Sequence, residues 1–252
     1  DDGPKFCGVD WGCDNDSKYG KGLIDEDKLY PNGNNDWAPG DDKGGKHADG
    51  KINFDFGVDK PGHVDVHGLK VTDSAGVVLM DITFSYDEAT NTYTPSGPSD
   101  LKTADGHLIT LEASLDEGTG LLTIIGRDSE DGSEAFVYTL QTTGYDKGEF
   151  DFCLNEPLYH PYTDPDSDND GPQKSFEDNL KFELNVRGYD VDGDYASGNI
   201  CINVDDDSPK AECDYECVVE GKTDGELNFV TGNIVTGDGN TIFGNDSNNL
   251  DG

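Results

Sequence analysis

Basic residues are scarce in this chain of 252 residues. There are 17 lysines and arginines against 54 aspartates and glutamates, which gives a formal net charge of -37. Nucleic acid is excluded as an expected partner because phosphate binding needs a basic surface, and docking on anionic lipid is disfavoured for the same reason. A charge of this size repels a compact fold unless it is compensated. Bound divalent cations or a solvated, halophile-like surface would both compensate it, and the clustering of the aspartates favours cations.

Long apolar runs and the common catalytic motifs are also lacking. No run approaches the roughly 18 apolar residues that cross a membrane, so no membrane insertion is expected. The chain contains no G-x-S-x-G, P-loop or H-E-x-x-H motif, so the sequence predicts no enzyme. A pair of carboxylates for glycoside hydrolysis is not excluded, but only because acidic residues are abundant. No signal peptide is visible, and the chain begins within a pattern, so we expect an excised segment.

No stretch has a helical stripe of useful length, whereas apolar and polar residues alternate from residue 51 onwards. Ile52, Phe54, Phe56 and Val58 show this period of two, which is typical of a half-buried strand. Further strands are predicted at 64–71, 77–86, 107–113, 121–125, 135–140, 149–154, 180–189 and 200–205. Short turn sequences separate them. This pattern indicates a sandwich or a barrel, and the strand at 180–189, with one apolar and one polar face, suits a sandwich. We therefore expect an all-β fold, an antiparallel β-sandwich of the Ig-like or cadherin-like kind with long calcium-binding loops.

A short sequence at the start of the chain returns near its end. Residues 1–5 read DDGPK and residues 206–210 read DDSPK, each followed closely by a cysteine. We therefore expect one complete copy of a long repeat and the start of another. The predicted parts are a loop-rich region at 1–50, a calcium-binding sandwich at 51–209 and a truncated next repeat at 210–252.

Six cysteines form an even set that permits several pairings. We expect local disulfides within two close pairs and a bridge between two strands. The candidates are Cys7 with Cys13, Cys213 with Cys217, and Cys153 with Cys201. Zinc is the rival interpretation, but no Cys-x-x-Cys knuckle is present. Disulfides would imply an oxidising compartment.

The most specific motif is the acidic loop at 166–171, which is followed by Glu177. It fits D-x-D-x-D-G-x5-E, in which alternate carboxylates point at one hard cation and the glycine permits a sharp turn. Prolines before the loop and a strand after it exclude a helix-loop-helix pair. The predicted calcium ligands are Asp164, Asp166, Asp168, Asp170 and Glu177. A solvated acidic loop is the alternative.

A second acidic motif follows the strand at 180–189. Asp190, Asp192 and Asp194 alternate around a glycine, a spacing that suits calcium, although an ordinary Asp-Gly turn would look the same. One strand later come three consecutive aspartates, and a cation shared there would tie one unit to the next. These further predicted ligands are Asp205, Asp206 and Asp207. His63, Asp65 and His67 also alternate, but an exposed strand face explains them more simply than a transition-metal site.

The chain resembles the calcium-binding tandem repeats of giant type I-secreted RTX adhesins and biofilm-associated proteins. The segments that carry the resemblance are 24–34, 41–45, 54–59, 157–161, 182–194, 198–209 and 231–237. The resemblance implies β-sandwich modules that fold with Ca2+ outside the cell, at the bacterial surface. Asp190, Asp192 and Asp194 match its acidic turn. The six cysteines and Tyr159, where the family often has aspartate, are departures.

We therefore expect a calcium-stabilised extracellular module that acts as a structural extender in adhesion or biofilm formation. Its expected partners are neighbouring repeats of the same chain. A calcium-dependent module that binds a glycan or peptide at the adhesin tip is the alternative, favoured by the long loop region 1–50, by the aromatic residues in that region and by the cysteines.

Overall fold

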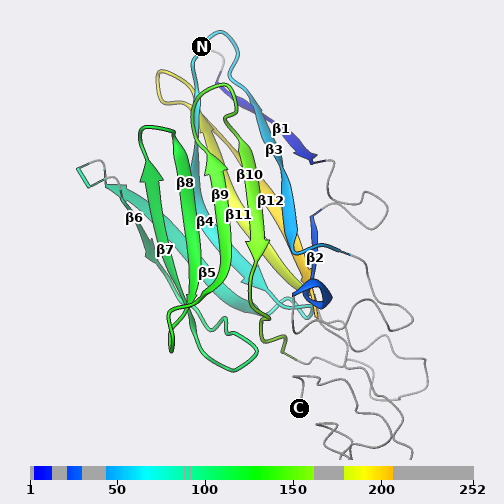
Figure 1. Ribbon diagram of the computed structural model, residues 1–252. Helices are drawn as coiled ribbons and strands as arrows, with labels where there is room; N and C mark the ends of the chain where they lie inside the picture. The colour runs from blue at the N-terminus through cyan, green and yellow to red at the C-terminus, as the bar shows by residue number, and fades with distance from the viewer. Residues whose placement is uncertain are drawn as a thin grey trace, which may run out of the picture.

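The computed structural model describes residues 3–12, 22–29, 44–87, 89–90, 92–161 and 179–206, and every structural statement below concerns these residues. Twelve strands form one sheet in the order β1-β3-β10-β9-β8-β7-β6-β5-β4-β11-β12-β2 (Figure 1). The strands are β1 (Lys5–Trp11), β2 (Leu23–Asp25), β3 (His47–Asp55), β4 (His63–Thr72), β5 (Val78–Asp87), β6 (Thr92–Ser96), β7 (Ile109–Asp116), β8 (Leu121–Asp128), β9 (Glu134–Gln141), β10 (Glu149–Leu154), β11 (Leu180–Tyr189) and β12 (Tyr195–Asp205). All neighbouring pairs are antiparallel except β12 and β2, which are parallel.

The sheet curls strongly, so that strands distant in the strand order face each other across the core. Phe182 of β11 lies 5.4 Å from Phe136 of β9 and 5.3 Å from Phe152 of β10, measured between ring centroids. All three side chains are buried. The all-β, mostly antiparallel fold is therefore confirmed. A two-sheet sandwich is not confirmed, because the strands form a single curled sheet that resembles half of a barrel (Figure 1).

Glycines in β11 and β12 let these strands approach β1 and β3, which lie at the other end of the strand order. A Cβ built on Gly198 of β12 would lie 2.5 Å from the Phe6 ring of β1, and one on Gly188 of β11 would lie 2.5 Å from the Phe54 ring of β3. The two aromatic side chains therefore occupy space that any larger residue would fill. This contact brings β1 against β12 although no ladder joins them.

The predicted strands exist, but the first fifty residues contribute more than loops. Strands β10 and β11 have the predicted bounds, and the others differ at their ends. Strands β1 and β2 lie within the expected loop-rich region, and they form the two edges of the sheet. A short 3-10 helix, η1 (Glu26–Lys28), follows β2, with Asp25 as its N-cap. Residues 207–252, which include the expected next repeat, lie outside the described residues.

The expected disulfide between Cys153 and Cys201 does not form. The neighbours of Cys153, Phe152 and Leu154, are buried, so strand alternation turns the thiol away from the core. Cys201 of β12 alternates in the same way between buried isoleucines. Both thiols are free, as is the exposed thiol of Cys7. Three other cysteines of the expected pairs, Cys13, Cys213 and Cys217, lie outside the described residues.

The start of β1 and the end of β12 lie at opposite ends of the curled sheet (Figure 1). A Cβ on Gly3 would lie 3.7 Å from Asp194, which is in the turn before β12, whereas Asp206 directly follows the far end of β12. Because a strand rises about 3.3 Å per residue, the 11 residues of β12 separate the two ends by roughly 35 Å.

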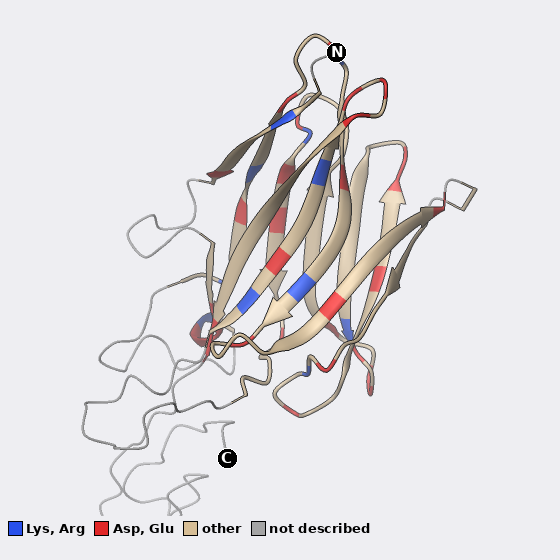
Figure 2. Cartoon of the chain, turned by 180° about the vertical axis from the view of Figure 1, so that it is seen from behind, with Lys and Arg blue, Asp and Glu red and all other residues tan. Residues whose placement is uncertain are grey.

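The charge is distributed unevenly over the fold. Acidic residues gather in loops and around η1, whereas the strands carry residues of both signs (Figure 2). Among the described residues, no helix has the length and apolar character that a membrane span requires.

Candidate cation sites

The turn between β11 and β12 brings Asp190, Asp192 and Asp194 together. One carboxylate oxygen from each lies within 4.8 Å of the other two. Asp190 organises this turn, because its Oδ1 accepts hydrogen bonds from the backbone N–H groups of Gly193, at 3.1 Å, and Asp194, at 2.9 Å. Gly193 has a φ of 97°, which glycine adopts without strain. The sequence motif thus forms a compact turn with three convergent carboxylates.

Asp190 is the anchor of this group. Its residue surface is only 3% exposed, and its Oδ2 has no hydrogen-bond partner among the described residues. The pKa of Asp192 is raised, first by the close approach of its carboxyl group to the Asp190 side chain, then by loss of solvent and by the charge of Asp190. Carboxylates held this close repel each other when ionised, and a hard cation would relieve both the repulsion and the unmatched oxygen.

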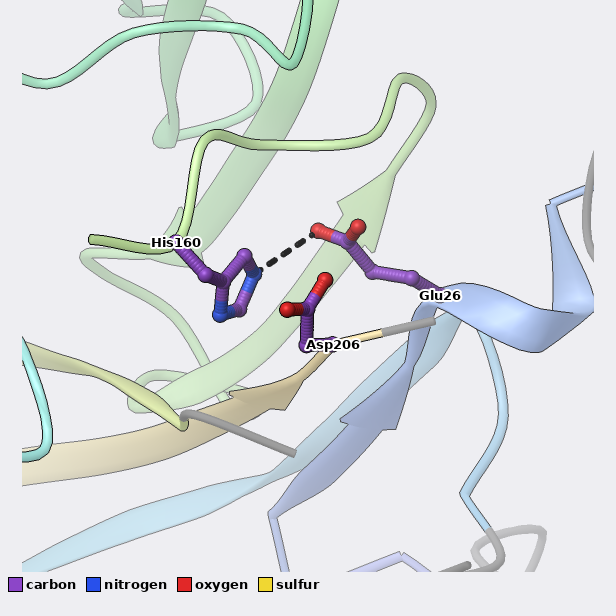
Figure 3. Close-up of side chains that lie close together, drawn as sticks. All are labelled: Glu26, His160 and Asp206. Carbon is purple, nitrogen blue, oxygen red and sulfur yellow. Dashed lines mark hydrogen bonds and ion pairs between the residues drawn. The ribbon is translucent and has the colours of Figure 1, made fainter. Parts of the chain in front are cut away.

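A second group lies at the opposite end of β12. Glu26, His160 and Asp206 come from η1, from the segment after β10 and from the residue after β12, and their side chains converge (Figure 3). The ligand atoms of the three lie within 4.8 Å of one another. His160 Nε2 is 3.2 Å from Glu26 Oε1, and the exposed fractions of these side chains are only 1% and 2%. The backbone N–H of Leu158 also donates to Glu26 Oε1, at 2.9 Å.

More buried carboxylates surround this second group. Asp25, Asp27 and Asp205 are each at most 3% exposed. Burial raises the pKa of Asp25 to about 6, although the backbone N–H of Gly44 and the nearby Lys28 oppose the rise. The Lys28 Nζ lies 3.8 Å from Asp25 Oδ2. So many carboxylates in a buried place are costly without positive charge beside them.

The predicted ligands therefore have different outcomes. The structure brings Asp190, Asp192 and Asp194 together, and it places Asp205 and Asp206 beside η1. The other predicted ligands lie outside the described residues: Asp164, Asp166, Asp168, Asp170, Glu177 and Asp207.

Sequence reasoning missed Glu26 and His160 as members of a site. Both belong to segments that carry the family resemblance, 24–34 and 157–161, and this was the available signal. The two segments are more than 130 residues apart in the chain. Only the fold shows that they meet.

The alternation of His63, Asp65 and His67 does not produce a metal-ligating group among the described residues. The ring of His63 stacks on Tyr189 with a centroid distance of 5.1 Å, and His67 Nε2 lies 3.0 Å from an Arg187 nitrogen. Asp65 accepts a hydrogen bond from the Tyr93 hydroxyl. These residues belong to the outer surface of the sheet, as the simpler interpretation proposes.

Four tyrosines gather around this surface, and we call Tyr86, Tyr93, Tyr189 and Tyr195 the tyrosine patch. The Tyr86 and Tyr93 rings lie 4.8 Å apart, and those of Tyr189 and Tyr195 lie 5.5 Å apart. Arg187 lies 4.5 Å above the Tyr195 ring. The Tyr93 hydroxyl donates to Asp65, and the ring of His63, two residues earlier on β4, stacks on Tyr189. The patch combines aromatic faces with polar groups.

Comparison with family models, with curated proteins and with solved structures gave no match. The resemblance to RTX adhesin repeats therefore stays a prediction.

Proposed function

We propose that this chain is a calcium-stabilised, non-enzymatic module of an extracellular RTX adhesin, in which it acts as a structural extender. The observation that carries the proposal is the turn of Asp190, Asp192 and Asp194. Its three carboxylates converge, and one oxygen of the buried Asp190 has no partner among the described residues. Calcium takes carboxylate oxygens in flexible geometry and would satisfy this arrangement.

The positions of the first and the last described residues favour an extender. The chain enters the fold near Asp194 and leaves β12 at Asp206, roughly 35 Å away. Modules connected in this way add their lengths when they follow one another, as tandem arrays do. A sandwich-like module, exported and folded by calcium outside the cell, is what the family resemblance implies for such an array.

The charge of the chain gives independent support. The formal charge of -37 opposes compaction, and bound Ca2+ reduces it where aspartates converge. A cation that binds only the folded state also stabilises that state by mass action, by about 2.7 kcal/mol at a free concentration of 100 times Kd.

The test is a thermal unfolding series on the full chain in EDTA, in Ca2+ and in Mg2+ at equal ionic strength. We expect a higher Tm in Ca2+, a dependence of Tm on Ca2+ concentration and a smaller response to Mg2+. Calorimetric titration then gives the number of ions bound. A Tm that is the same in excess chelator and in millimolar Ca2+ would end the proposal.

The second candidate function is calcium-dependent binding of a glycan, and the tyrosine patch favours it. Tyr195 is 53% exposed and lies beside Arg187, so it offers a ring face and a nearby donor to a sugar. A glycan array probed with and without Ca2+ separates this function from the extender. Binding that Tyr195→Ala abolishes and that Tyr145→Ala leaves unchanged would support it, because Tyr145 is 95% exposed and lies elsewhere.

A further inference from the structure

We propose that Glu26, His160 and Asp206 bind a divalent transition-metal ion at the end of the module where the chain leaves β12. This site differs from the Asp190 turn in location and in chemistry, and no calcium ion is needed for it. It therefore goes beyond the proposed calcium-stabilised module.

The first argument is the convergence of three segments on one point. The ligand atoms of the three residues lie within 4.8 Å of one another, so one ion can contact all of them. Figure 3 shows the Asp206 carboxylate beside the contact between His160 and Glu26. The backbone N–H of Leu158 holds the Glu26 carboxylate, at 2.9 Å from Oε1. Such support orients a metal ligand before the ion arrives.

The second argument is the donor set. Calcium and magnesium take oxygen ligands, whereas an imidazole nitrogen suits zinc, iron, cobalt, nickel or copper. One histidine with two carboxylates is a mixed set, in which the histidine selects for a transition metal. The set also lacks a thiolate, because no cysteine belongs to this three-ligand group among the described residues.

The third argument is burial. The side chains of His160 and Glu26 are 1% and 2% exposed, and charged groups buried so deeply are paired or bind metal ions. Three more buried carboxylates adjoin the site, on the same two short segments at 25–27 and 205–206. An ion with two positive charges would compensate this local excess of negative charge.

The ion would connect parts of the chain that are far apart in sequence. Glu26 starts η1, His160 follows β10 and Asp206 follows β12, so one ion would cross-link three segments at the exit from the fold. Segments tied in this way lose freedom relative to one another. The site would therefore fix the end of β12 against η1 and against the segment that follows β10.

Titration of the metal-free full chain with Co2+ tests the proposal, with absorption spectroscopy and calorimetry as readouts. We expect one Co2+ per chain without the near-ultraviolet band of a thiolate ligand, and we expect Co2+ to shift the NMR signals of the His160 ring. His160→Gln should weaken this binding roughly 100-fold, since even losing an outer partner of a metal ligand costs about 10-fold to 100-fold.

The matched control is His107→Gln. His107 also pairs with a carboxylate, with 2.9 Å between its Nδ1 and Asp128 Oδ2, but it belongs to no three-ligand group among the described residues. This variant should change Co2+ affinity less than twofold. Equal affinity in wild type and in a folded His160→Gln variant would overturn the proposal, as would a Co2+ complex that leaves the His160 ring signals unshifted.

Calcium competition decides the selectivity and keeps the two proposals separate. If millimolar Ca2+ displaces Co2+ from His160, the assignment to a transition metal is wrong. Asp192→Asn should leave Co2+ binding at His160 unchanged. The His160 site can therefore hold or fail independently of calcium stabilisation at the Asp190 turn.

Discussion

The change Asp192→Asn separates a calcium-binding turn from an ordinary Asp-Gly turn. Asp192 is an exposed member of the turn, and its carboxylate lies within 4.8 Å of those of Asp190 and Asp194. The hydrogen bonds that fold the turn go to Asp190 Oδ1, so the substitution leaves them intact. Without calcium, the asparagine removes a like charge from the turn, and we expect a Tm equal to or above that of wild type.

With calcium, the sign reverses, because the asparagine removes a charged ligand. At a free Ca2+ concentration of 100 times the wild-type Kd, binding stabilises the fold by about 2.7 kcal/mol. A 100-fold weaker site under the same conditions keeps only about 0.4 kcal/mol. The difference of about 2.3 kcal/mol corresponds to roughly 5–9 °C in Tm for a domain of this size.

Differential scanning calorimetry of both proteins in EDTA and in Ca2+ measures the change in Tm that the substitution causes without and with calcium. The control is Asp105→Asn, which removes one charge from another exposed turn and has no place in a three-ligand group. It should behave as wild type in both buffers. If Asp192→Asn and Asp105→Asn respond alike to Ca2+, the turn is not a calcium site and the reasoning is refuted.

Three further substitutions test the fold and its ionisable groups. Phe182→Ala removes a ring that is 1% exposed at the centre of the core and should lower the free energy of unfolding by about 3–5 kcal/mol in urea titrations; a loss below 1 kcal/mol would contradict the core described above. Tyr138→Phe should be neutral or stabilising by about 1 kcal/mol in the same assay, because the buried Tyr138 hydroxyl has no partner among the described residues. The hydrogen bond to Asp128 raises the pKa of His107 above its usual 6.5. Wild type should therefore be more stable than His107→Gln, with the full difference in unfolding free energy below pH 6.5 and none once the pH exceeds the raised pKa. A difference that grows with pH would show that His107 and Asp128 do not interact.

Much of the strand order in sequence could be predicted, because one face of each strand is buried. Leu180, Phe182, Leu184 and Val186 alternate with polar residues, and β11 has the predicted bounds. The pattern fails where a strand lies at an edge or carries few apolar residues. Strand β2 has only three residues, and β6 contains Pro95, which reads as a turn signal.

The way in which the sheet closes could not be predicted, since alternation shows which face is buried but not what covers it. A two-sheet sandwich and one curled sheet bury the same alternate residues. The contacts that distinguish them depend on small residues such as Gly188 and Gly198, which make room for aromatic rings from β3 and β1. A glycine in a strand pattern indicates a close approach without naming the partner.

The two candidate sites also differ in how far the sequence alone predicts them. Asp190, Asp192 and Asp194 are neighbours in sequence, so their spacing alone predicts that they converge. Glu26 and His160 are brought together by the parallel pairing of β2 with β12 and by the segment that follows β10. Local motifs reveal sites within one turn, whereas a site built from three segments requires the fold.

The two candidate cation sites lie at the two ends of the fold, and the short range of charge interactions in salt solution makes these positions important. At physiological ionic strength the Debye length is about 8 Å, whereas the ends of the module are roughly 35 Å apart. If copies follow one another as proposed, charges on the body of one module are screened from the next, and repulsion between consecutive modules comes from the acidic groups at their ends. The Asp190 turn lies at one end and Glu26, Asp205 and Asp206 lie at the other. Monovalent salt weakens this repulsion but leaves the end segments free to move, whereas a coordinated ion removes both the charge and the freedom. Cations bound at both ends would thus make the proposed acidic array both extended and stiff.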